Sequence, residues 1–313
     1  MDKLFKKTKD TIVENNLIND GDKVLVAWSG GPDSTALLFL LRELQDSLNF
    51  HVEAFYFNHD SRKDSSAEES FVSLLSEKKL VELHIVKSDK RITGSGPEDT
   101  WRQERYSAIK KLVTEKNFDK VATGHTLDDN LETLLIRLGR GLGLEGIKGI
   151  PLKREYFIRP FLNSTKEDLL GYLNARNLEW YEDPSNTNNL TRASLRKNVI
   201  PALKNSWGRY WPSGPEKSLA ILAEENQSLN VLSGDLLRIY LTQEGLSTEV
   251  FNLPPAISLR VVKNWLYSLG VNPPRGVLER VLKEGKGKKK IFIEGPSWFK
   301  VEIRNGKIFY LGK

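Results

Sequence analysis

The sequence of 313 residues contains no cysteine. Disulfide bonds, thiolate zinc sites, iron–sulfur clusters and cysteine nucleophiles are therefore excluded for this chain. The sequence also lacks any run approaching the roughly 18 apolar residues of a membrane span, and its first residues lack the apolar core of a signal peptide. We expect a protein without a membrane segment. The lack of cysteine is compatible with a reducing compartment, and we expect a cytoplasmic location.

Most of the chain also lacks an excess of positive or negative charge. Residues 1–208 contain 31 Lys and Arg and 31 Asp and Glu, whereas residues 209–313 contain 16 and 10. The whole net charge of +6 therefore lies in the last third. Its densest cluster consists of Lys286, Lys288, Lys289 and Lys290, which can bind the phosphates of a polyanion. A solvated basic segment that protects a strand edge is the alternative.

Short apolar runs alternate with helical segments in the first part of the chain. The expected strands are 23–27, 51–57, 83–86 and 120–123, and the expected helices between them are 35–44, 65–80 and 97–112. Continuously apolar strands separated by helices predict an α/β fold, with a parallel sheet covered on both faces. Ligands of such sheets bind beyond the carboxyl ends of the strands.

The remainder of the chain predicts mostly helices. The expected segments are a mainly helical region at about 126–208, helices at 216–240 and 256–269, and a terminal β-hairpin at Asn305-Gly306. Ser164 and Glu167 have the spacing of a capping box, and the irregular stretch 205–215 indicates a domain boundary. We therefore expect a first domain at 1–208 and a smaller, basic, mainly helical domain at 209–313 that ends in a β-hairpin.

A phosphate-binding loop is expected directly after the first strand. Ala27 ends that strand, and the loop and helix start that follow contain Ser29, Gly30, Gly31, Pro32, Asp33 and Ser34. Glycines let the backbone approach an anion, the helix start supplies free N–H groups, and the hydroxyls add donors. A carboxylate at an anion site makes sense if Asp33 holds Mg²⁺ against the phosphates. An ordinary strand-to-helix turn, capped by Asp33 or Ser34, is the alternative.

A second group of polar residues follows the fourth expected strand. His125 lies at the end of that strand, and Asp128 and Asp129 begin a helix, where carboxylates suit the helix dipole. Glu132 lies three residues after Asp129, so the two share one helix face. Such carboxylates can hold Mg²⁺, with Asp128 as a ligand, or an amino group. A capped helix without a ligand is the alternative.

These two motifs resemble a known family. The string Ser-Gly-Gly-x-Asp-Ser resembles that of the PP-loop ATP pyrophosphatase superfamily. The string Gly-His-x-x-Asp-Asp at 124–129, and further strings as far as residue 196, resemble the tRNA(Ile)-lysidine synthase family. The resemblance spans residues 20–205 and implies a Rossmann-like PP-loop domain of the adenine nucleotide alpha hydrolase type. Two departures are Asn130, where the family has Gln, and Ala193, where it has Asn.

The resemblance implies a ligase that uses ATP and Mg²⁺ to join free lysine to a tRNA. The substrate would be the wobble cytidine of the isoleucine tRNA with a CAU anticodon. Its C2 oxygen would attack the α-phosphate of ATP with release of pyrophosphate, and lysine would then attack C2 and displace AMP to give lysidine. Because the implied substrate is a tRNA, we expect Lys286, Lys288, Lys289 and Lys290 to bind RNA phosphates. Nucleotide contacts are implied for the loop and for His125, and catalytic roles for Asp33, Asp129, Glu132, Arg105 and Arg196. Structural ion pairs are the alternative for the two arginines.

Two other interpretations belong to different functional classes. One is another PP-loop tRNA-modifying or synthetase enzyme, such as a tRNA thiolase, but the thiolases considered use cysteine pairs. The other is a non-enzymatic RNA-binding protein on the same fold, but that predicts decay of the loop or the carboxylates, and both are intact. The sequence leaves the oligomeric state open, a homodimer included.

Overall fold

The computed structural model describes residues 3–58, 65–88, 97–141, 143–147, 149–182, 190–287, 290–295 and 299–312. The chain forms two compact units, Met1–Leu219 and Ala220–Lys313. The division falls within a long helix, α10 (Ser213–Tyr240), whereas the boundary expected from the sequence precedes that helix. None of the helices in the described ranges is long and apolar enough to cross a membrane.

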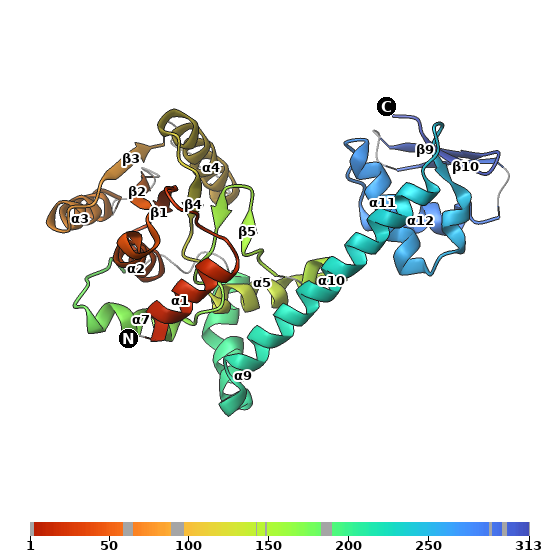
Figure 1. Cartoon of the computed structure of the whole chain (residues 1–313). Coiled ribbons are helices and arrows are strands. Elements are labelled where there is room, and N and C mark those ends of the chain that lie inside the picture. Colours follow the sequence, from red (N-terminus) through yellow and green to blue (C-terminus); the bar gives the residue numbers. More distant parts are fainter. Residues whose placement is uncertain are drawn as a thin grey trace. The chain divides into compact units, whose positions relative to one another are not determined.

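The first unit is built around a six-stranded sheet (Figure 1). Its order is β3-β2-β1-β4-β6-β5, and all neighbours pair in parallel except β5 with β6. The strands are β1 (Lys23–Ala27), β2 (His51–Asn58), β3 (Leu83–Lys87), β4 (Lys120–Ala122), β5 (Lys153–Arg154) and β6 (Phe157–Ile158). The predicted parallel sheet and its four strands are confirmed. The sequence did not predict β5 and β6, because strands of two residues are too short to show an apolar pattern.

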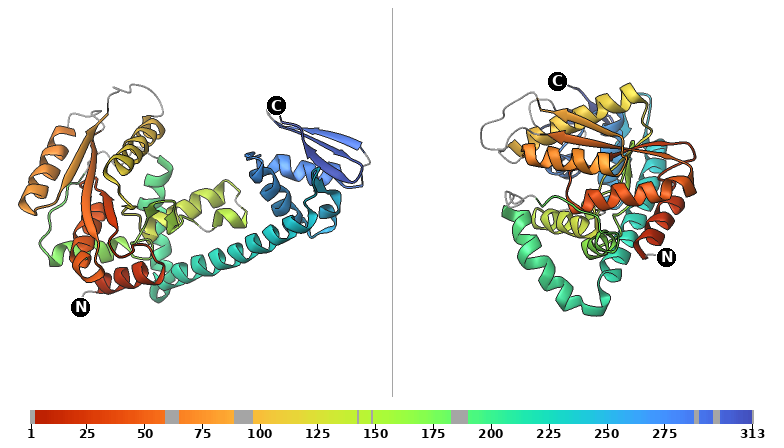
Figure 2. Two further views of the ribbon diagram at one scale, coloured as in Figure 1. Left: turned by 45° about the horizontal axis from the view of Figure 1, so that its top comes forward. Right: turned by 90° about the vertical axis from the view of Figure 1, so that its left-hand side faces the viewer.

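Helices cover both faces of this sheet (Figure 2). Successive side chains of a strand point to opposite faces. Val24 and Val26 therefore share one core with α1, α2, α3 and α7, whereas Leu25 belongs to a second core with α4. The bounds are α1 (Lys3–Glu14), α2 (Pro32–Leu48), α3 (Ser65–Lys78), α4 (Pro97–Lys116) and α7 (Lys166–Ala175). Burial on both faces explains why β1 is a continuous apolar run.

The predicted capping box of Ser164 with Glu167 is wrong by one residue. Thr165 is the N-cap of α7, and its hydroxyl accepts a hydrogen bond from the Asp168 amide at 3.1 Å. The Asp168 carboxylate accepts one from the Thr165 amide at 3.1 Å. The Ser164 carbonyl instead accepts a hydrogen bond from the Leu127 amide at 2.9 Å. Since Leu127 is the first residue of α5 (Leu127–Gly139), this bond ties the starts of α5 and α7 together.

Short helical elements complete the first unit. They are α6 (Leu144–Ile147), α8 (Leu190–Ser194), the π-helical turn η1 (Leu195–Val199), α9 (Ile200–Trp207) and the 3-10 turn η2 (Gly208–Tyr210). The run from α8 through α9 is continuous and includes Arg196 in the π-helical turn. π-helical turns inside helices are frequent at functional sites.

The second unit packs helices against an antiparallel sheet of order β7-β10-β9-β8. Its elements beyond α10 are β7 (Leu246–Ser247), the 3-10 turn η3 (Thr248–Asn252), α11 (Pro255–Ser268), α12 (Arg275–Gly285), β8 (Lys290–Glu294), β9 (Lys300–Arg304) and β10 (Lys307–Tyr310). Asn305 and Gly306 adopt φ angles of 50° and 74° between β9 and β10, which confirms the predicted hairpin. The sequence did not predict α12 and β7.

Candidate active site

The loop between β1 and α2 is held in shape by its own side chains. The Ser34 hydroxyl accepts a hydrogen bond from the Ser29 amide at 3.1 Å and donates one to the Gly31 carbonyl at 3.1 Å. Gly30 adopts a left-handed φ of 76°, and a Cβ there would lie 3.2 Å from Val72 Cγ1. Gly31 is the N-cap of α2 and supplies no side-chain cap. The first amides of α2 are therefore left for an anion.

Close packing brings the end of β4 to the same loop. Gly124 lies so near the start of α2 that a Cβ at this position would be 3.0 Å from the Asp33 carbonyl oxygen. A larger residue would push the two segments apart. Glycine at 124 therefore places His125, and the start of α5 just after it, next to the phosphate loop.

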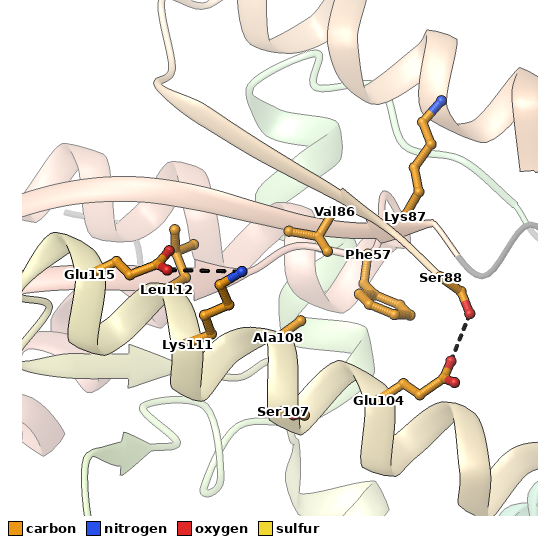
Figure 3. Close-up of a pocket in the computed structure, with 10 residues that line it drawn as sticks. All are labelled: Phe57, Val86, Lys87, Ser88, Glu104, Ser107, Ala108, Lys111, Leu112 and Glu115. Carbon is orange, nitrogen blue, oxygen red and sulfur yellow. Dashed lines mark hydrogen bonds and ion pairs between the residues drawn. The ribbon is translucent and has the colours of Figure 1, made fainter. Parts of the chain in front are cut away.

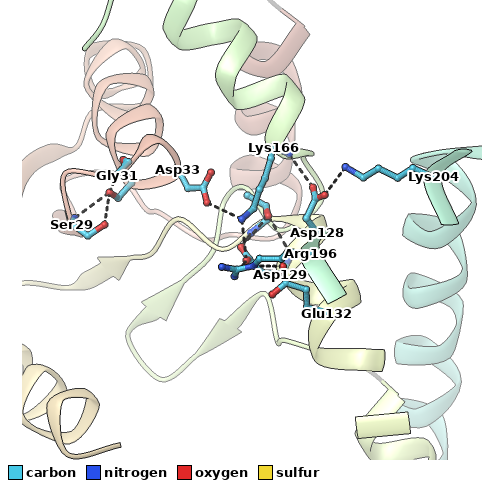
Figure 4. Close-up of polar contacts among 11 residues, drawn as sticks. Ser29, Gly31, Asp33, Asp128, Asp129, Glu132, Lys166, Arg196 and Lys204 are labelled. Carbon is cyan, nitrogen blue, oxygen red and sulfur yellow. Dashed lines mark hydrogen bonds and ion pairs between the residues drawn. The ribbon is translucent and has the colours of Figure 1, made fainter. Parts of the chain in front are cut away.

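Three carboxylates and two cations meet beside the loop (Figure 4). Lys166 Nζ, at the start of α7, lies 3.5 Å from Asp33 Oδ2 and 3.6 Å from Asp129 Oδ1. Arg196 Nη2 lies 3.3 Å from the same Asp129 oxygen, and Arg196 Nε lies 2.5 Å from Glu132 Oε1. We call these five residues the charged cluster. It joins α2, α5, α7 and the π-helical turn at one edge of the sheet.

Asp129 contributes one carboxylate oxygen to the fold and the other to the charged cluster. Its Oδ2 accepts hydrogen bonds from the Thr126 amide at 2.9 Å and the Thr126 hydroxyl at 3.0 Å, which closes the capping box of α5. Burial alone would raise the pKa of Asp129, but Lys166, the Thr126 amide and other positive neighbours hold this pKa below its usual range. Asp129 is therefore ionised at neutral pH.

The pKa values of Asp33 and Lys166 are shifted as well. Burial raises the pKa of the Asp33 carboxyl, with a further contribution from the negative charge of Asp129, and Lys166 only partly opposes it. Burial would lower the pKa of Lys166, but the two carboxylates outweigh it and raise this pKa. Lys166 is therefore a cation at neutral pH. With all its carboxylates ionised, the charged cluster has one more carboxylate than it has cations, which favours an added cation.

Asp128 points away from this cluster toward α9. Its Oδ1 lies 2.7 Å from Lys204 Nζ, and its Oδ2 accepts a hydrogen bond from the Lys166 amide at 3.0 Å. Lys204 also contacts Glu167 at 2.6 Å (Figure 4 shows the Asp128 contacts). Asp128 thus fixes the position of α7, and its predicted role as a metal ligand remains an untested prediction.

His125 lies among charged groups of both signs. Burial lowers the pKa of His125 to about 4; the negative charge of Asp129 opposes this shift, and Arg159, Arg102 and Arg105 add to it. The imidazole is therefore neutral at pH 7, and its Nδ1 lies 2.9 Å from Thr123 Oγ1. No ion pair within the described ranges involves Arg105, and burial lowers the pKa of its guanidinium. The vicinity of His125 thus offers positive charge to an anionic or carbonyl-bearing ligand.

Asn130, where the resembling family has Gln, supports a neighbouring loop. Its Oδ1 accepts a hydrogen bond from the Ile150 amide at 2.7 Å. Gly149 packs directly on this side chain at a φ of 63°. Arg137 donates to the Gly146 and Gly149 carbonyls at 3.1 and 2.9 Å. These two side chains therefore stabilise the turn that follows α6.

Replacing Gly149 with Ala is expected to destabilise the protein by about 2 kcal/mol or more, because the new Cβ would lie 1.9 Å from Asn130 Oδ1 and the φ is strained. A matched control is Gly171→Ala in α7, where nothing lies within 4 Å of an added Cβ. The control is expected to stabilise by about 0.5–1 kcal/mol. Urea unfolding of both variants measures the difference, and equal stabilities would contradict the packing argument.

The structure gathers most of the predicted site residues at one edge of the sheet. The phosphate loop, His125, Asp129, Glu132 and Arg196 lie there, and Ala27 and Pro32 flank the loop as the end of β1 and the first residue of α2. The predicted RNA-binding residues Lys286 and Lys290 lie next to α12 and at the start of β8, and Lys288 and Lys289 lie outside the described residues.

Sequence reasoning missed two cations of this site, Lys166 and Lys204. The sequence shows only that Lys166 directly follows the N-cap of α7, which does not predict its ionic partners. The residues that neutralise Lys166 are separated from it in sequence, so only the fold brings them together. A separate cavity of about 420 Å³ lies between the ends of β2 and β3 and α4, and none of the predicted site residues lines it (Figure 3).

Comparison with known proteins agrees with this geometry. The family model of the PP-loop domain matches residues 1–203. The chain belongs to this family. The predicted PP-loop fold is thus confirmed. A similar fold is found in the solved structure of the U34-tRNA thiolase NcsA from Methanococcus maripaludis. That structure has a TM-score of 0.58, is 18% identical, and the match covers 71% of this chain and 78% of that one.

Curated relatives of this PP-loop protein include several tRNA(Ile)-lysidine synthases. The one from Clostridium perfringens is 36% identical over 212 residues, which is 64% of this chain and 45% of that protein. The one from Chlorobaculum tepidum is 34% identical over 65% of this chain and 63% of that protein. The bifunctional protein TilS/HprT from Listeria monocytogenes is 34% identical over 79% of this chain and 40% of that protein. The chain thus spans less than two thirds of the length of these relatives.

Proposed function

We propose that this chain catalyses the ATP-dependent joining of free lysine to C2 of the wobble cytidine in the isoleucine tRNA with a CAU anticodon. The observation that carries the proposal is that the phosphate loop and the carboxylates of the charged cluster lie together at one edge of the sheet. The loop suits the phosphates of ATP, and the carboxylates suit an amine. The names of the relatives supply the tRNA substrate.

The phosphate loop would bind the pyrophosphate part of ATP. Its two serines and the first amides of α2 are donors, and hydrogen bonds within the loop hold the serines in place. Asp33 and Asp129 lie on either side of one cation, Lys166 Nζ, so the pair also fits a divalent ion with oxygen ligands. Mg²⁺ held there would neutralise charge on the phosphates.

The cytidine would be held next to His125. Its C2 oxygen attacks the α-phosphate of ATP, and pyrophosphate leaves. Because His125 is neutral at pH 7, it can hydrogen-bond to the base without adding charge. Arg105 and Arg196 are the candidates for contacts to the α-phosphate or the cytosine. Arg196 is held by its ion pairs with Asp129 and Glu132.

The lysine amine would be received by Asp129 and Glu132. An ammonium group requires carboxylate partners and must lose a proton before it attacks C2 and displaces AMP. Glu132 is buried and Asp129 is held ionised, so both remain as acceptors. Arg196 contacts both carboxylates, so the incoming amine would compete with Arg196 for them.

The direct test is to incubate the purified chain with ATP, lysine, Mg²⁺ and an unmodified isoleucine tRNA bearing CAU. Nucleoside mass spectrometry should detect lysidine, and AMP and pyrophosphate should form in equal amounts. A tRNA with a different wobble base is the matched control. Transfer of sulfur or another amine, or nucleotide hydrolysis without a modified base, would point to a different PP-loop enzyme.

The basic second unit would bind the tRNA backbone. Replacing Lys286 and Lys290 with Ser is expected to reduce the salt dependence of tRNA binding by about 1 unit of logarithmic slope for each lost phosphate contact. The measurement is tRNA affinity across a salt series, with ATP affinity expected to stay unchanged. Replacing Lys3 and Lys6 of α1 removes the same charge from exposed positions of the first unit. An identical slope change in that control would show an effect of net charge alone.

A further inference from the structure

A second group of ligand-type side chains lies at the opposite edge of the sheet. His51 and Glu53 belong to the start of β2, and Glu82 and His84 lie at the start of β3. The charged cluster of the candidate active site instead lies beyond the carboxyl ends of the strands. The two groups are therefore separate, and the proposed function does not use this one.

Strand register explains why these four side chains share one face. Residues two apart on a strand point the same way, which pairs His51 with Glu53 and Glu82 with His84. The parallel register sets Ala54 opposite Leu83, so Glu53 and Glu82 are neighbours across the two strands. A His-x-Glu sequence beside a Glu-x-His sequence thus places two imidazoles and two carboxylates together.

The distances are those of a nearly assembled ligand set. His51 Nε2 lies 3.3 Å from Glu53 Oε1, and His84 Nε2 lies 3.9 Å from Glu82 Oε1. Two ligands of tetrahedral zinc are about 3.4 Å apart, given metal–ligand bonds near 2.1 Å. One ligand atom each from His51, Glu53 and Glu82 lies within 4.8 Å of the others. His84 is not one of these three residues: its Nε2 lies 2.6 Å from the other oxygen of Glu53, Oε2, and would have to exchange this contact for the metal ion.

Burial makes Glu53 the anchor of this group. Its side chain is 5% exposed, whereas those of His51 and Glu82 are 57% and 61% exposed and can adjust. The Glu53 carboxylate is therefore held in place by the sheet, and the exposed side chains can move toward it.

We propose that His51, Glu53, Glu82 and His84 bind a divalent transition metal ion of the Zn²⁺ class. Imidazole nitrogen suits Zn²⁺ or Cu²⁺, whereas Mg²⁺ prefers oxygen ligands alone. Lys23 Nζ lies 3.5 Å from Glu53 Oε1 and competes with the metal for this oxygen. Lys23 can release Glu53, because it also lies 3.4 Å from the Lys116 carbonyl and 5.0 Å from the centre of the Phe118 ring.

The test is titration with Zn²⁺ by calorimetry in excess Mg²⁺, and with Co²⁺ by visible absorption, on the full chain. One Zn²⁺ should bind, and Co²⁺ should give the spectrum of a tetrahedral site. His51→Ala and Glu82→Gln change exposed side chains and should each weaken binding by at least ~10-fold. Lys23→Gln removes the competing cation and should strengthen it. Asp33→Asn, at the other edge, should have no effect.

The result that overturns the proposal is equally specific. Absence of stoichiometric binding, or binding that His51→Ala leaves unchanged, would show that the four residues and Lys23 only neutralise one another. Loss of binding in Asp33→Asn would assign the ion to the candidate active site. Because none of these measurements uses tRNA, lysine or ATP, the outcome is independent of the proposed function.

Discussion

Replacing Asp33 with Asn is expected to slow adenylation by about 10²–10³-fold, the size of effect seen when one preorganised charge-stabilising group is lost. Asp33 is a carboxylate at the start of the helix whose amides face the phosphate loop. An anion at this position repels phosphate unless a cation lies between them. The Asn variant therefore loses the ability to position a divalent cation, while the loop itself is unchanged. Pyrophosphate exchange into ATP, measured with tRNA present, reports this step.

The same substitution is expected to leave the melting temperature nearly unchanged. Burial raises the pKa of Asp33, which means that ionisation of this carboxyl does not stabilise the folded state. Removing its charge should therefore cost little unfolding free energy. Lys166 also keeps its second partner, Asp129, at 3.6 Å. Full activity of Asp33→Asn with an unchanged melting curve would remove Asp33 from the mechanism.

Asp128→Asn is the matched control for this experiment. Both Asp128 oxygens are engaged, one by Lys204 and the other by the Lys166 amide. Placing an amide NH₂ against one of these donors should cost about 1–3 kcal/mol of unfolding free energy. We thus expect the Asp128 variant to lose stability first and the Asp33 variant to lose catalysis first. The reverse pattern would make Asp128 the functional carboxylate.

The parts of the fold that the sequence predicts are those with local causes. Apolar runs give the four main strands, and the glycine-containing loop after β1 follows from phosphate-binding chemistry. Asn305-Gly306 predicts its turn because both residues tolerate positive φ. In contrast, β5 and β6 are fixed by pairing with each other and with β4, and nothing in two residues signals that.

Of the charged cluster, the sequence predicts the three carboxylates and Arg196 but not Lys166. Asp129 and Glu132 are three residues apart, so helical geometry alone puts them together. Lys166 meets Asp33 because α7 packs against α2, where the Tyr172 hydroxyl of α7 donates to Glu43 of α2 at 2.8 Å. That contact links residues far apart in sequence, and no periodicity reveals it. Similarly, the capping box of α7 was misplaced by one residue because Ser164 and Thr165 both have capping side chains.

Replacing Glu132 with Gln is expected to raise the apparent KM for lysine by at least ~10-fold, since a charge-assisted hydrogen bond is lost at a buried site. Glu132 is 1% exposed, and its Oε1 lies 2.5 Å from Arg196 Nε. The neutral amide can still accept one hydrogen bond, but it no longer offers a charge to an ammonium group. The KM for ATP should change less, because the phosphate loop has no contact with this side chain in the described residues.

The comparison that decides the role of Glu132 is a second Glu-to-Gln change nearby. Glu167→Gln on α7 alters an exposed side chain that contacts Lys204; within the described ranges this side chain forms no ion pair with the charged cluster. It should leave the KM for lysine unchanged, so the two variants separate a specific effect from a loss of local charge. Initial rates at varied lysine and varied ATP give both constants. Equal increases in the two KM values for Glu132→Gln would show that Glu132 positions Arg196 or a metal ion rather than the lysine amine. Arg196 would then carry the contact to substrate, because the Glu132 carboxylate holds its guanidinium in place.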